Sequence, residues 1–524
     1  MRHALEDTLD TMKYTLLLLA AAGNALPLTE YTGMFVSIPE GALHLKTLHH
    51  VFQGPGPKLS HKPFGFAGQA TGGSTNLSAV YVVSNAAELR EAVALPYTKT
   101  IYVNGTIQGN QLPNGTLATC QDYIDKTGSP GSAVHGFNFE TYLLSLNATY
   151  VALVEQAIAD NTTFEGRNAT EYRALLGHQN GYRPVVAATQ KAQVGFKLTN
   201  NTSLIGLNGN AALNGINLYL SSVDNIWIRN LKLVPPQDCF PAPETFPSSW
   251  NALYDAVGLV TASNVWVDNC ELQDQLSGEY VEPDIIEPGW QVDRFDGLFD
   301  CEDGTDNVTF SHNIVRNHHK SLLLGGGTKE ADRDLGKMHF TIFGNYFNGS
   351  ASRNPTMRFG SFDIFSNIYE ARNDKPPRFN DAGQAHRREA LDSTPLDAVF
   401  QYHLGVYNQS RVQVQDNGFL QYGAFANDTS RIFTISEAIL PNRPAKVCIR
   451  ETAPHFPSTM NGAAIASLGQ VMADTVDFFV ESGGAVEGAV VLTCDGFGGY
   501  ELPKVFEGPG DVLEYVLSEA GQVR

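Results

Sequence analysis

The chain repeats one short sequence pattern along much of its length. The copies begin at Asp224 (DNIWIRNLKL), Ser263 (SNVWVDNCEL), Asp306 (DNVTFSHNIV), His339 (HFTIFGNYF), Ser361 (SFDIFSNIY) and Ser410 (SRVQVQDNGF). In each copy two apolar residues stand two positions apart, which is the period of a β-strand. Strands that recur at irregular gaps, without a helical pattern between the copies, are typical of a solenoid. The pattern therefore predicts an all-β chain folded as a right-handed parallel β-helix.

A polar position follows most copies of the pattern. It is asparagine in four of them and cysteine in one: Asn313, Asn345, Asn367, Asn417 and Cys270. Side-chain amides at the same corner of successive coils can hydrogen-bond to one another. We therefore expect the four asparagines to stack in one interior ladder.

A second set of strand-like segments lies between the copies. These segments are DAVGLV from Asp255, DGLFDC from Asp296, SLLLGG from Ser321 and TMRFGS from Thr356. Neighbouring strands of a sheet lie about 4.8 Å apart. Polar residues on successive members of this set should therefore be neighbours in space, and the loops beside them are where function is expected.

The chain has 524 residues, yet a solenoid grows by adding coils and needs no division into domains. We expect a secretory signal over residues 1–25, an N-terminal extension over 26–64 and one β-helix domain over 65–524. The signal rests on a basic start at Lys13, the apolar run TLLLLAAAGNA and cleavage near Ala25. Met12 is a better initiator for such a signal than Met1, because the acidic residues between them do not suit the start of a signal. A membrane anchor is the alternative, but the apolar run is shorter than the ~20 residues that a span needs.

Two segments have helical rather than strand spacing. Residues from about 120 to 197 contain FNFETYLLSLNATYVALVEQAI and TEYRALLGHQ, which predict a helical insertion between early coils. The segment DVLEYVLSEAG near the C-terminus predicts a helix that could cover the final coil, as an exposed solenoid end requires. We expect the first strand at KTIYVNGTI, from Lys99.

The cysteines and the sequons agree with an oxidising, glycosylating route of export. Six cysteines allow fifteen pairings, among which Cys448 with Cys494 is plausible because both stand in the C-terminal segment. Cys270 and Cys301 follow strand positions and should be small buried residues. About a dozen Asn-x-Ser/Thr sequons occur, for example at Asn76, Asn104, Asn147, Asn168, Asn348 and Asn427.

The net charge of −20 argues against nucleic acid and against an anionic membrane surface as partners. Basic residues are nevertheless concentrated on two consecutive coils: Arg316, His318, His319, Lys320, Arg353 and Arg358. Such a group is either a solvated basic face or a positive cleft that attracts an anion. The acidic composition alone does not decide between the two.

Three carboxylates precede or begin successive strands of the second set. Asp255, Asp296 and Asp300 would converge when the coils stack, and hard oxygen ligands of this kind suit calcium. Isolated aspartates at loop edges are, however, usually solvated or cap a turn. Lys320, Arg353 and Arg358 follow on the next coils, where arginine can bind carboxylates bidentately. Their alternative role is that of exposed cations at a strand-edge turn.

Several segments together resemble the pectate lyases of polysaccharide lyase family one. They are GFAGQATGG from Gly65, NTSLIGLNGNAALNG from Asn201, SNVWVDNC, FDGLFD, HHKSLLLGG, SRNPTMRFG from Ser352 and the terminal VLEYVLSEAGQVR. The resemblance implies a secreted monomer that acts on polygalacturonate or pectin with Ca²⁺. It implies calcium ligands at Asp255, Asp296 and Asp300, substrate-binding cations at Lys320 and Arg358, and a catalytic arginine at Arg353. Lys375 and Arg378 are further candidates for the cleft.

The chain departs from the family pattern in three places. The usual Trp-Ile-Asp-His is replaced by Trp266-Val267-Asp268-Asn269, and the acidic residue common just before the phrase that carries His318 and Lys320 is not present. Leu253 stands where some members carry an additional acidic ligand. The number and affinity of calcium ions therefore stay open. The reaction implied is β-elimination, in which the proton at C5 is removed and the C4 glycosidic oxygen leaves.

Three other readings compete with a pectate lyase. A pectin lyase would act on methyl-esterified polymer without calcium, and a glycoside hydrolase would need an acid and a base flanking the bond. A β-helix that only binds polysaccharide would retain the coils and lack the charged set. The three aligned carboxylates and the cations beside them favour the pectate lyase.

Overall fold

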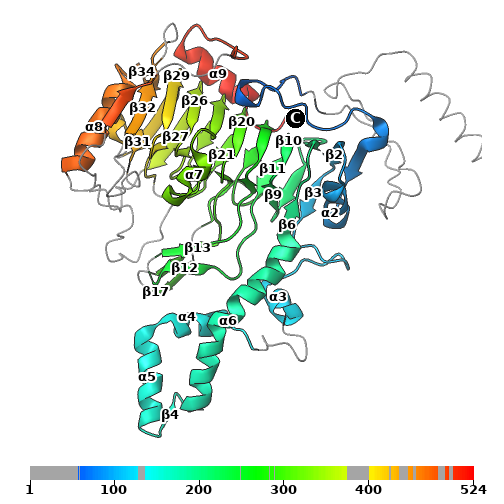
Figure 1. Cartoon of the computed structure of the whole chain (residues 1–524), viewed down its shortest axis with the longest axis vertical. Helices are drawn as coiled ribbons and strands as arrows, with labels where there is room; N and C mark the ends of the chain where they lie inside the picture. The colour runs from blue at the N-terminus through cyan, green and yellow to red at the C-terminus, as the bar shows by residue number, and fades with distance from the viewer. Residues whose placement is uncertain are drawn as a thin grey trace, which may run out of the picture.

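The computed structural model describes residue 57 and residues 59–127, 136–247, 249–281, 284–287, 290–373, 400–423, 426–435, 446–451, 456–481, 490–494 and 500–523. In this part of the chain three long sheets run side by side along one solenoid (Figure 1). Strands that are neighbours in these sheets come from successive coils and pair in parallel, except for one antiparallel pair, Thr459–Met460 with Ala463–Ala464, at an edge of the third sheet. The predicted parallel β-helix is confirmed.

The repeated pattern forms the first sheet, which has eleven strands. In spatial order they are β1 (Val80–Val83), β2 (Lys99–Val103), β7 (Thr202–Gly206), β10 (Asp224–Arg229), β15 (Ser263–Asp268), β20 (Asp306–Ser311), β23 (His339–Phe343), β26 (Ser361–Phe365), β29 (Arg411–Gln415), β32 (Lys446–Arg450) and β35 (Val490–Thr493). The expectation for the first strand was wrong, because β1 precedes the segment from Lys99 and pairs with it in parallel.

The second set of segments forms a sheet of eight strands. They are β6 (Gly195–Lys197), β9 (Asn217–Ser221), β14 (Val257–Val260), β19 (Phe299–Glu302), β22 (Leu322–Leu324), β25 (Thr356–Met357), β28 (Leu404–Val406) and β31 (Phe433–Thr434). Gly258 lies opposite Asp300 in this sheet, and Asp300 lies opposite Leu323. The segments that carry the predicted site are therefore neighbours in space.

A third sheet of ten strands follows the asparagine corner. Its strands are β3 (Thr106–Gln108), β8 (Ala212–Asn214), β11 (Lys232–Val234), β16 (Glu271–Leu272), β21 (Ile314–Arg316), β24 (Tyr346–Asn348), β27 (Ile368–Asn373), β30 (Gly418–Gly423), β33 (Thr459–Met460) and β34 (Ala463–Ala464). The sequence did not predict this sheet. Most of its strands have only two or three residues, which is too short for a period of two to be recognised.

The asparagine ladder is confirmed. Oδ1 of Asn345 accepts from the backbone N (2.9 Å) and Nδ2 (3.2 Å) of Asn313. Asn367 accepts from Asn345 in the same way, and Asn417 accepts from Asn367. Cys270 continues the ladder through its backbone N, which donates to Asn313 Oδ1. All four asparagines are buried, so the ladder supplies hydrogen bonds at a corner that water does not reach.

Apolar side chains stack along the interior in the same register. Phe347, Tyr369 and Phe419 are neighbours on successive coils, with ring centroids 4.8 and 5.0 Å apart. The spacing equals that of the strands, so each ring packs on the ring of the next coil. The interior of the solenoid is thus one continuous hydrophobic core.

The predicted helical insertion projects from the solenoid as an arm (Figure 1). It consists of α3 (Cys120–Thr127), α4 (Phe139–Leu146), α5 (Ala148–Ala159) and α6 (Ala169–Val194), with the hairpin β4 (Thr163–Phe164) and β5 (Arg167–Asn168) at its tip. Asn147 and Asn168, both in sequons, cap α5 and α6 by accepting backbone N–H groups. At its base the arm packs on the hairpins β12 (Ala242–Thr245) with β13 (Ser249–Asn251), and β17 (Asp284–Glu287) with β18 (Trp290–Val292).

The two ends of the solenoid are covered by helices other than the one expected. At the N-terminal end α2 (Ala86–Ala94) packs Leu89 and Val93 on the core, and at the C-terminal end α8 (Leu468–Glu481) packs against β31 and β35. The predicted helix is α9 (Pro509–Glu519), but it lies along the side of the middle coils, on Phe343 and Phe365. The short α7 (Ala331–Asp334) stands in the loop after β22.

Two disulfides join four of the described cysteines in pairs. The predicted bond between Cys448 and Cys494 is present, and a second bond joins Cys120 of α3 to Cys239 before β12. Cys270 and Cys301 are free and buried, as expected. The proposed signal lies outside the described residues. Within them, no helix is both long enough and apolar enough to span a membrane.

Candidate active site

The three predicted calcium-binding aspartates lie on two successive coils of the eight-stranded sheet. Asp255 precedes β14, Asp296 precedes β19, and Asp300 is part of β19. A Cβ built on Gly258 would lie 3.1 Å from Oδ2 of Asp255. Since Gly258 lies opposite Asp300, the carboxylates of Asp255 and Asp300 share one side of the sheet.

These carboxylates repel one another. Burial, followed by the charges of Asp300 and Asp296, raises the pKa of Asp255 well above its usual range. Burial and Asp296 also raise the pKa of Asp300 to about 7, although the nearby guanidinium of Arg353 lowers it. A divalent cation would relieve the repulsion, so the donor set fits Ca²⁺.

Gly297 makes room for this arrangement. Its backbone N donates a hydrogen bond of 3.0 Å to Oδ1 of Asp255. A Cβ on Gly297 would lie 2.1 Å from Oδ1 of Asp300, a separation that no side chain could keep. Gly297 therefore orients one aspartate and leaves space for another.

Lys320 reaches the aspartates from the next coil. Its strand position pairs with Ser352, and its Nζ lies 3.3 Å from Oδ1 of Asp296 and 3.7 Å from Oδ2 of Asp293. Burial lowers the pKa of Lys320, but the charges of Asp296 and Asp293 outweigh burial and the pKa is raised. Lys320 is therefore a permanent cation at the edge of the carboxylate group.

Arg353 and Arg358 differ in how they are placed. Arg353 follows Ser352 with a backbone φ of 58° and stays partly exposed, and its charge acts on both Asp300 and Lys320. Arg358 is only 4% exposed, its Nη1 donates to the carbonyl of Gly325 at 2.6 Å, and its guanidinium lies 4.9 Å from the centroid of the Tyr407 ring. Of the three predicted cations, Arg358 is the one that the fold buries.

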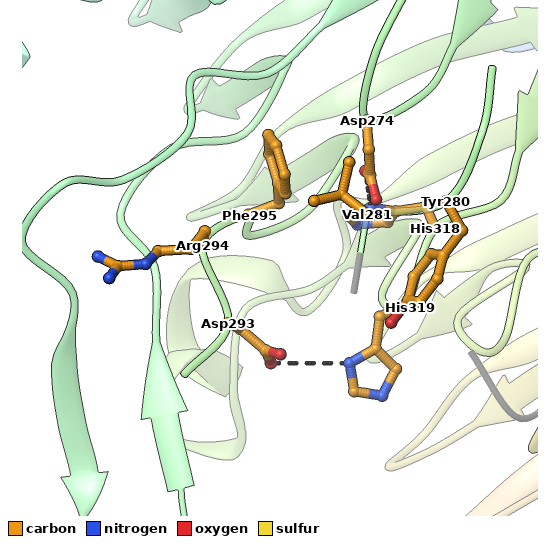
Figure 2. Close-up of a pocket in the computed structure, with 8 residues that line it drawn as sticks. All are labelled: Asp274, Tyr280, Val281, Asp293, Arg294, Phe295, His318 and His319. Atoms are coloured by element: carbon orange, nitrogen blue, oxygen red, sulfur yellow. Dashed lines mark hydrogen bonds and ion pairs between the residues drawn. The ribbon is translucent and has the colours of Figure 1, made fainter. Parts of the chain in front are cut away.

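Beside Lys320, two histidines are held by aspartates that the sequence did not single out (Figure 2). His318 Nδ1 lies 2.5 Å from Oδ1 of Asp274, and His319 Nδ1 lies 3.6 Å from Oδ2 of Asp293. His318 Nε2 also lies 3.1 Å from the carbonyl oxygen of Lys320. Burial lowers the pKa of His318, but Asp274 more than compensates and the pKa is raised. Both histidines are therefore paired with aspartates, and we regard them as residues that position the segment around Lys320 rather than as free cations.

The remaining predicted positions fall elsewhere. Arg316 ends β21 in the ten-stranded sheet and so belongs to a different sheet from Arg353 and Arg358. Lys375 and Arg378 lie outside the described residues. The positive group predicted from the sequence is therefore reduced here to Lys320, Arg353 and the buried Arg358, with the two histidines beside them.

Known proteins share both the sequence and the fold of this chain. A family model for pectate lyases matches residues 179–431. This segment, close to half of the chain, belongs to the pectate lyase family. A pectate lyase of Bacillus subtilis is 25% identical over 414 residues, which span 78% of this chain and 86% of that protein. Pectate lyase E of Dickeya chrysanthemi is 32% identical over 181 residues, 34% of this chain and 46% of the relative.

Solved pectate lyase structures agree with the fold. A thermostable pectate lyase superimposes with a TM-score of 0.64 at 24% identity, covering 88% of this chain and 96% of the other. A pectate lyase bound to a hexasaccharide gives a TM-score of 0.62 at 22% identity, with 88% and 96% covered. The matches in sequence and fold make the chain a polysaccharide lyase.

A second group of histidines and a carboxylate includes Asp268, which stands in the segment where the chain departs from the family pattern. Among the described residues, the one group of three whose ligand atoms all lie within 4.8 Å of one another is His61, Asp268 and His312. The predicted aspartates do not form so compact a group. Asp268, however, is already held by Arg229 at 2.7 Å and by His312 at 2.8 Å. This group therefore acts as a structural clamp.

The clamp joins three distant parts of the chain. His61 comes from the N-terminal segment and stacks on His312 with ring centroids 3.7 Å apart. His312 Nε2 lies 2.9 Å from the hydroxyl of Tyr515 in α9. Asn269, which replaces the family's usual histidine, donates to the backbone carbonyl of Glu519 at 2.6 Å. This part of the fold explains why α9 lies along the side of the solenoid.

Sequence reasoning missed four supporting residues of the site: Asp274, Asp293, Gly297 and Asn217. The amide of Asn217 donates to the backbone carbonyl of Asp255 at 2.8 Å. Asn217 begins β9, a strand that the sequence analysis did not include in the second set. Asp274 and Asp293 stand in long loops, and nothing in their local sequence indicates which histidine they meet.

Proposed function

We propose that this chain cleaves α-1,4-linked polygalacturonate by calcium-assisted β-elimination and releases 4,5-unsaturated oligogalacturonates. The observation that carries the proposal is the pair of mutually repelling carboxylates, Asp255 and Asp300, next to the cations of the following coils. A cleft that only held a neutral sugar would not need this arrangement. The hexasaccharide complex of a structural relative supports an oligosaccharide ligand.

Asp255, Asp296 and Asp300 are the residues that would hold Ca²⁺. When bound, the ion supplies Lewis-acid stabilisation of the negative charge that develops on the substrate carboxylate. The structural reason for this assignment is that Asp255 and Asp300 share one side of the sheet, where Gly258 and Gly297 leave room for their carboxylates. A cation there would favour the ionised form of both groups.

Lys320 and Arg358 would orient the carboxylates of the polymer. Lys320 already lies at the edge of the aspartate group, 3.3 Å from Asp296, so it can exchange this contact for a substrate carboxylate. Arg358 lies deeper, and its side chain would have to leave the carbonyl of Gly325 before contacting substrate directly. We therefore assign Lys320 the larger part of substrate binding.

Arg353 is the proposed base. It would take the proton from C5, the C5–H electron pair would form the C4=C5 double bond, and the C4–O bond would break with its electrons remaining on the glycosidic oxygen. A proton from solvent then completes the new chain end. A guanidinium ordinarily stays protonated. The charge of Lys320, which acts on Arg353, disfavours the protonated form. The reaction should therefore be fastest at alkaline pH.

We further infer that the protein is secreted and acts on cell-wall polymer as a monomer. The apolar run after Met12 and the two disulfides between distant segments support this location. Mass spectrometry of protein recovered from the culture medium would give the mature N-terminus, which we expect near Leu26.

One assay separates this activity from that of a pectin lyase. Unsaturated products should appear from polygalacturonate with calcium, disappear after exhaustive chelation and return when calcium is added back. Methyl-esterified pectin should be the poorer substrate. Full activity on either polymer after chelation would refute the calcium site and favour the pectin lyase.

A further inference from the structure

A cavity of about 410 Å³ lies between the helical arm and the solenoid. One wall is α6, and the other is the β12–β13 hairpin with the segment that leads to Asp255 (Figure 1). Its volume is within the range of small-molecule sites, about 300–1,000 Å³. The proposed catalytic residues do not line it.

The helix wall presents two cations toward the cavity. Arg183, Pro184, Ala187, Ala188 and Lys191 line it from α6, a spacing that places all five along one side of a helix. Nη1 of Arg183 donates to the carbonyl of Phe240 at 2.8 Å, so Arg183 also ties α6 to the opposite wall. The side chain of Lys191 is exposed and makes no hydrogen bond or ion pair with the side chains or backbone that the structure describes, whereas its backbone carbonyl accepts from Gly195 at the end of the helix.

The floor of the cavity carries a buried carboxylate that is already satisfied. Oδ1 of Asp238 accepts from the backbone N of Phe240 at 2.8 Å, and Oδ2 accepts from the backbone N of Leu253 at 3.0 Å. The charges of Arg294 and Arg183 act on the same carboxylate, so Asp238 already has two cationic neighbours other than Lys191. Glu244 is the other acidic residue of the lining, and it is exposed to solvent.

The rest of the lining suits the carbon face of a sugar ring. Pro184, Ala187, Ala188 and Pro243 are small or flat, and the side chain of Leu253 is 48% exposed, so it can contact a ligand in the cavity. Leu253 stands two residues before Asp255 and is bonded to Asp238 through its backbone. The cavity is thus joined by a short rigid link to the carboxylates of the proposed active site.

The strand order of the eight-stranded sheet gives the distance between the cavity and the proposed active site. α6 leads directly into β6, which is separated from β14 by one strand, and β14 precedes β19, β22 and β25 in order. At about 4.8 Å per strand, β6 and the strand after Arg353 are roughly 24 Å apart. Only a ligand of several sugar units could occupy both the cavity and the proposed active site.

We propose that the cavity is a remote subsite for an acidic sugar residue of the same polymer chain, with Lys191 binding its carboxylate. This inference rests on the proposed function, because it assumes an oligogalacturonate ligand. Apolar contacts from Leu253 and the helix alanines hold the ring, and Arg183 keeps the two walls together. The subsite makes long substrates bind more tightly than short ones.

The test compares the full-length protein with Lys191→Ala and Lys191→Glu. Each is assayed on polygalacturonate and on the shortest oligogalacturonate that the wild type cleaves. We expect KM for the polymer to rise about three- to tenfold in Lys191→Ala and further in Lys191→Glu. The value of kcat and the KM for the short oligomer should not change, and Lys191→Arg should restore binding of the polymer. Lys191 is exposed, so folding should be preserved.

A matched control uses the same helix. Arg173→Ala removes a cation from α6 that pairs with Glu155 at 2.9 Å, away from the cavity, and should leave both KM values unchanged. Equal losses on short and long substrates, or no loss on either, would overturn the subsite.

Calorimetry with an octagalacturonate, on proteins that also carry Arg353→Ala, measures binding without turnover. If the wild type cleaves nothing while octagalacturonate binding still depends on Lys191, the proposed activity fails and the subsite stands. Equal octagalacturonate affinity with and without Lys191 would remove the subsite whatever the activity.

Discussion

Gly297 lies so close to Asp300 that a Cβ added to the glycine would stand 2.1 Å from the carboxylate oxygen Oδ1. The same glycine donates its backbone N–H to Asp255. Two carboxylates of the proposed calcium site are therefore placed by one residue without a side chain. The carboxylate of Asp300 can occupy its position only because residue 297 has no side chain.

Gly297→Ala should displace the carboxylate of Asp300. We expect the calcium concentration needed for half-maximal activity to rise at least tenfold, with the thermal midpoint little changed, because the backbone of Gly297 is not in the left-handed region. Gly181→Ala is the control: Gly181 stands in α6 with nothing within 4 Å of its Cβ position, and alanine there should be neutral or slightly stabilising. Unchanged calcium dependence in Gly297→Ala would mean that Asp300 does not bind the ion.

Arg353→Lys should reduce kcat by on the order of 10²–10⁴, the usual contribution of a positioned general base. Lysine retains the charge but lacks the planar fork of the guanidinium. Steady-state rates on polygalacturonate at the optimum pH measure the effect, and calcium binding should stay as in the wild type. Arg333→Lys, at an exposed arginine paired with Asp303, is the matched control. If kcat survives in Arg353→Lys, Lys320 becomes the first candidate for the base.

Asn345→Leu should destabilise the solenoid without altering the site directly. The leucine would remove bonds to Asn313, Asn367 and the carbonyl of Phe310, all in the buried corner. Buried groups left unsatisfied cost about 1–3 kcal/mol each, so the free energy of unfolding should fall by several kcal/mol. Urea titration measures this, and Asn210→Leu at an exposed position should change it by less than about 0.5 kcal/mol.

Asp363→Asn should stabilise the protein at alkaline pH. Burial raises the pKa of Asp363 from 3.8 to about 7, and the carboxylate accepts a hydrogen bond from the hydroxyl of Tyr500. Because the folded pKa lies above the unfolded one, this residue costs stability progressively as pH rises from about 4 to about 7. The cost is about 1.4 kcal/mol for each pH unit between the two pKa values.

The amide introduced by Asp363→Asn carries no negative charge, and its oxygen can still accept a hydrogen bond from the hydroxyl of Tyr500. Urea unfolding of wild type and Asp363→Asn at pH 4 and pH 8 should therefore show a gain of a few kcal/mol for the variant at pH 8, relative to pH 4. Asp332→Asn, at an exposed aspartate, should show no such difference. Parallel pH profiles for wild type and Asp363→Asn would contradict the raised pKa.

The sequence was sufficient for the repeating part of the fold. A period of two and a recurring asparagine are local signals, and the stacking of coils converts them into one sheet and one ladder, as Asn313 and Asn345 illustrate. The same stacking brought Asp255 and Asp300 onto one side of the second sheet, as the sequence analysis expected. In these cases contacts between coils repeat at equivalent positions, so local pattern and tertiary contact coincide.

The tertiary structure alone decided what does not repeat. The very short strands of the ten-stranded sheet, the pairing of Asp274 with His318, the burial of Arg358 and the cavity beside Lys191 depend on loops of unequal length. α9 illustrates the same limit, because its amphipathic pattern shows that one face is buried but not against which coil. The sequence by itself determined the β-helix and the coils that carry the charged residues. Contacts between segments far apart in the chain, which no local pattern encodes, decided how those residues meet.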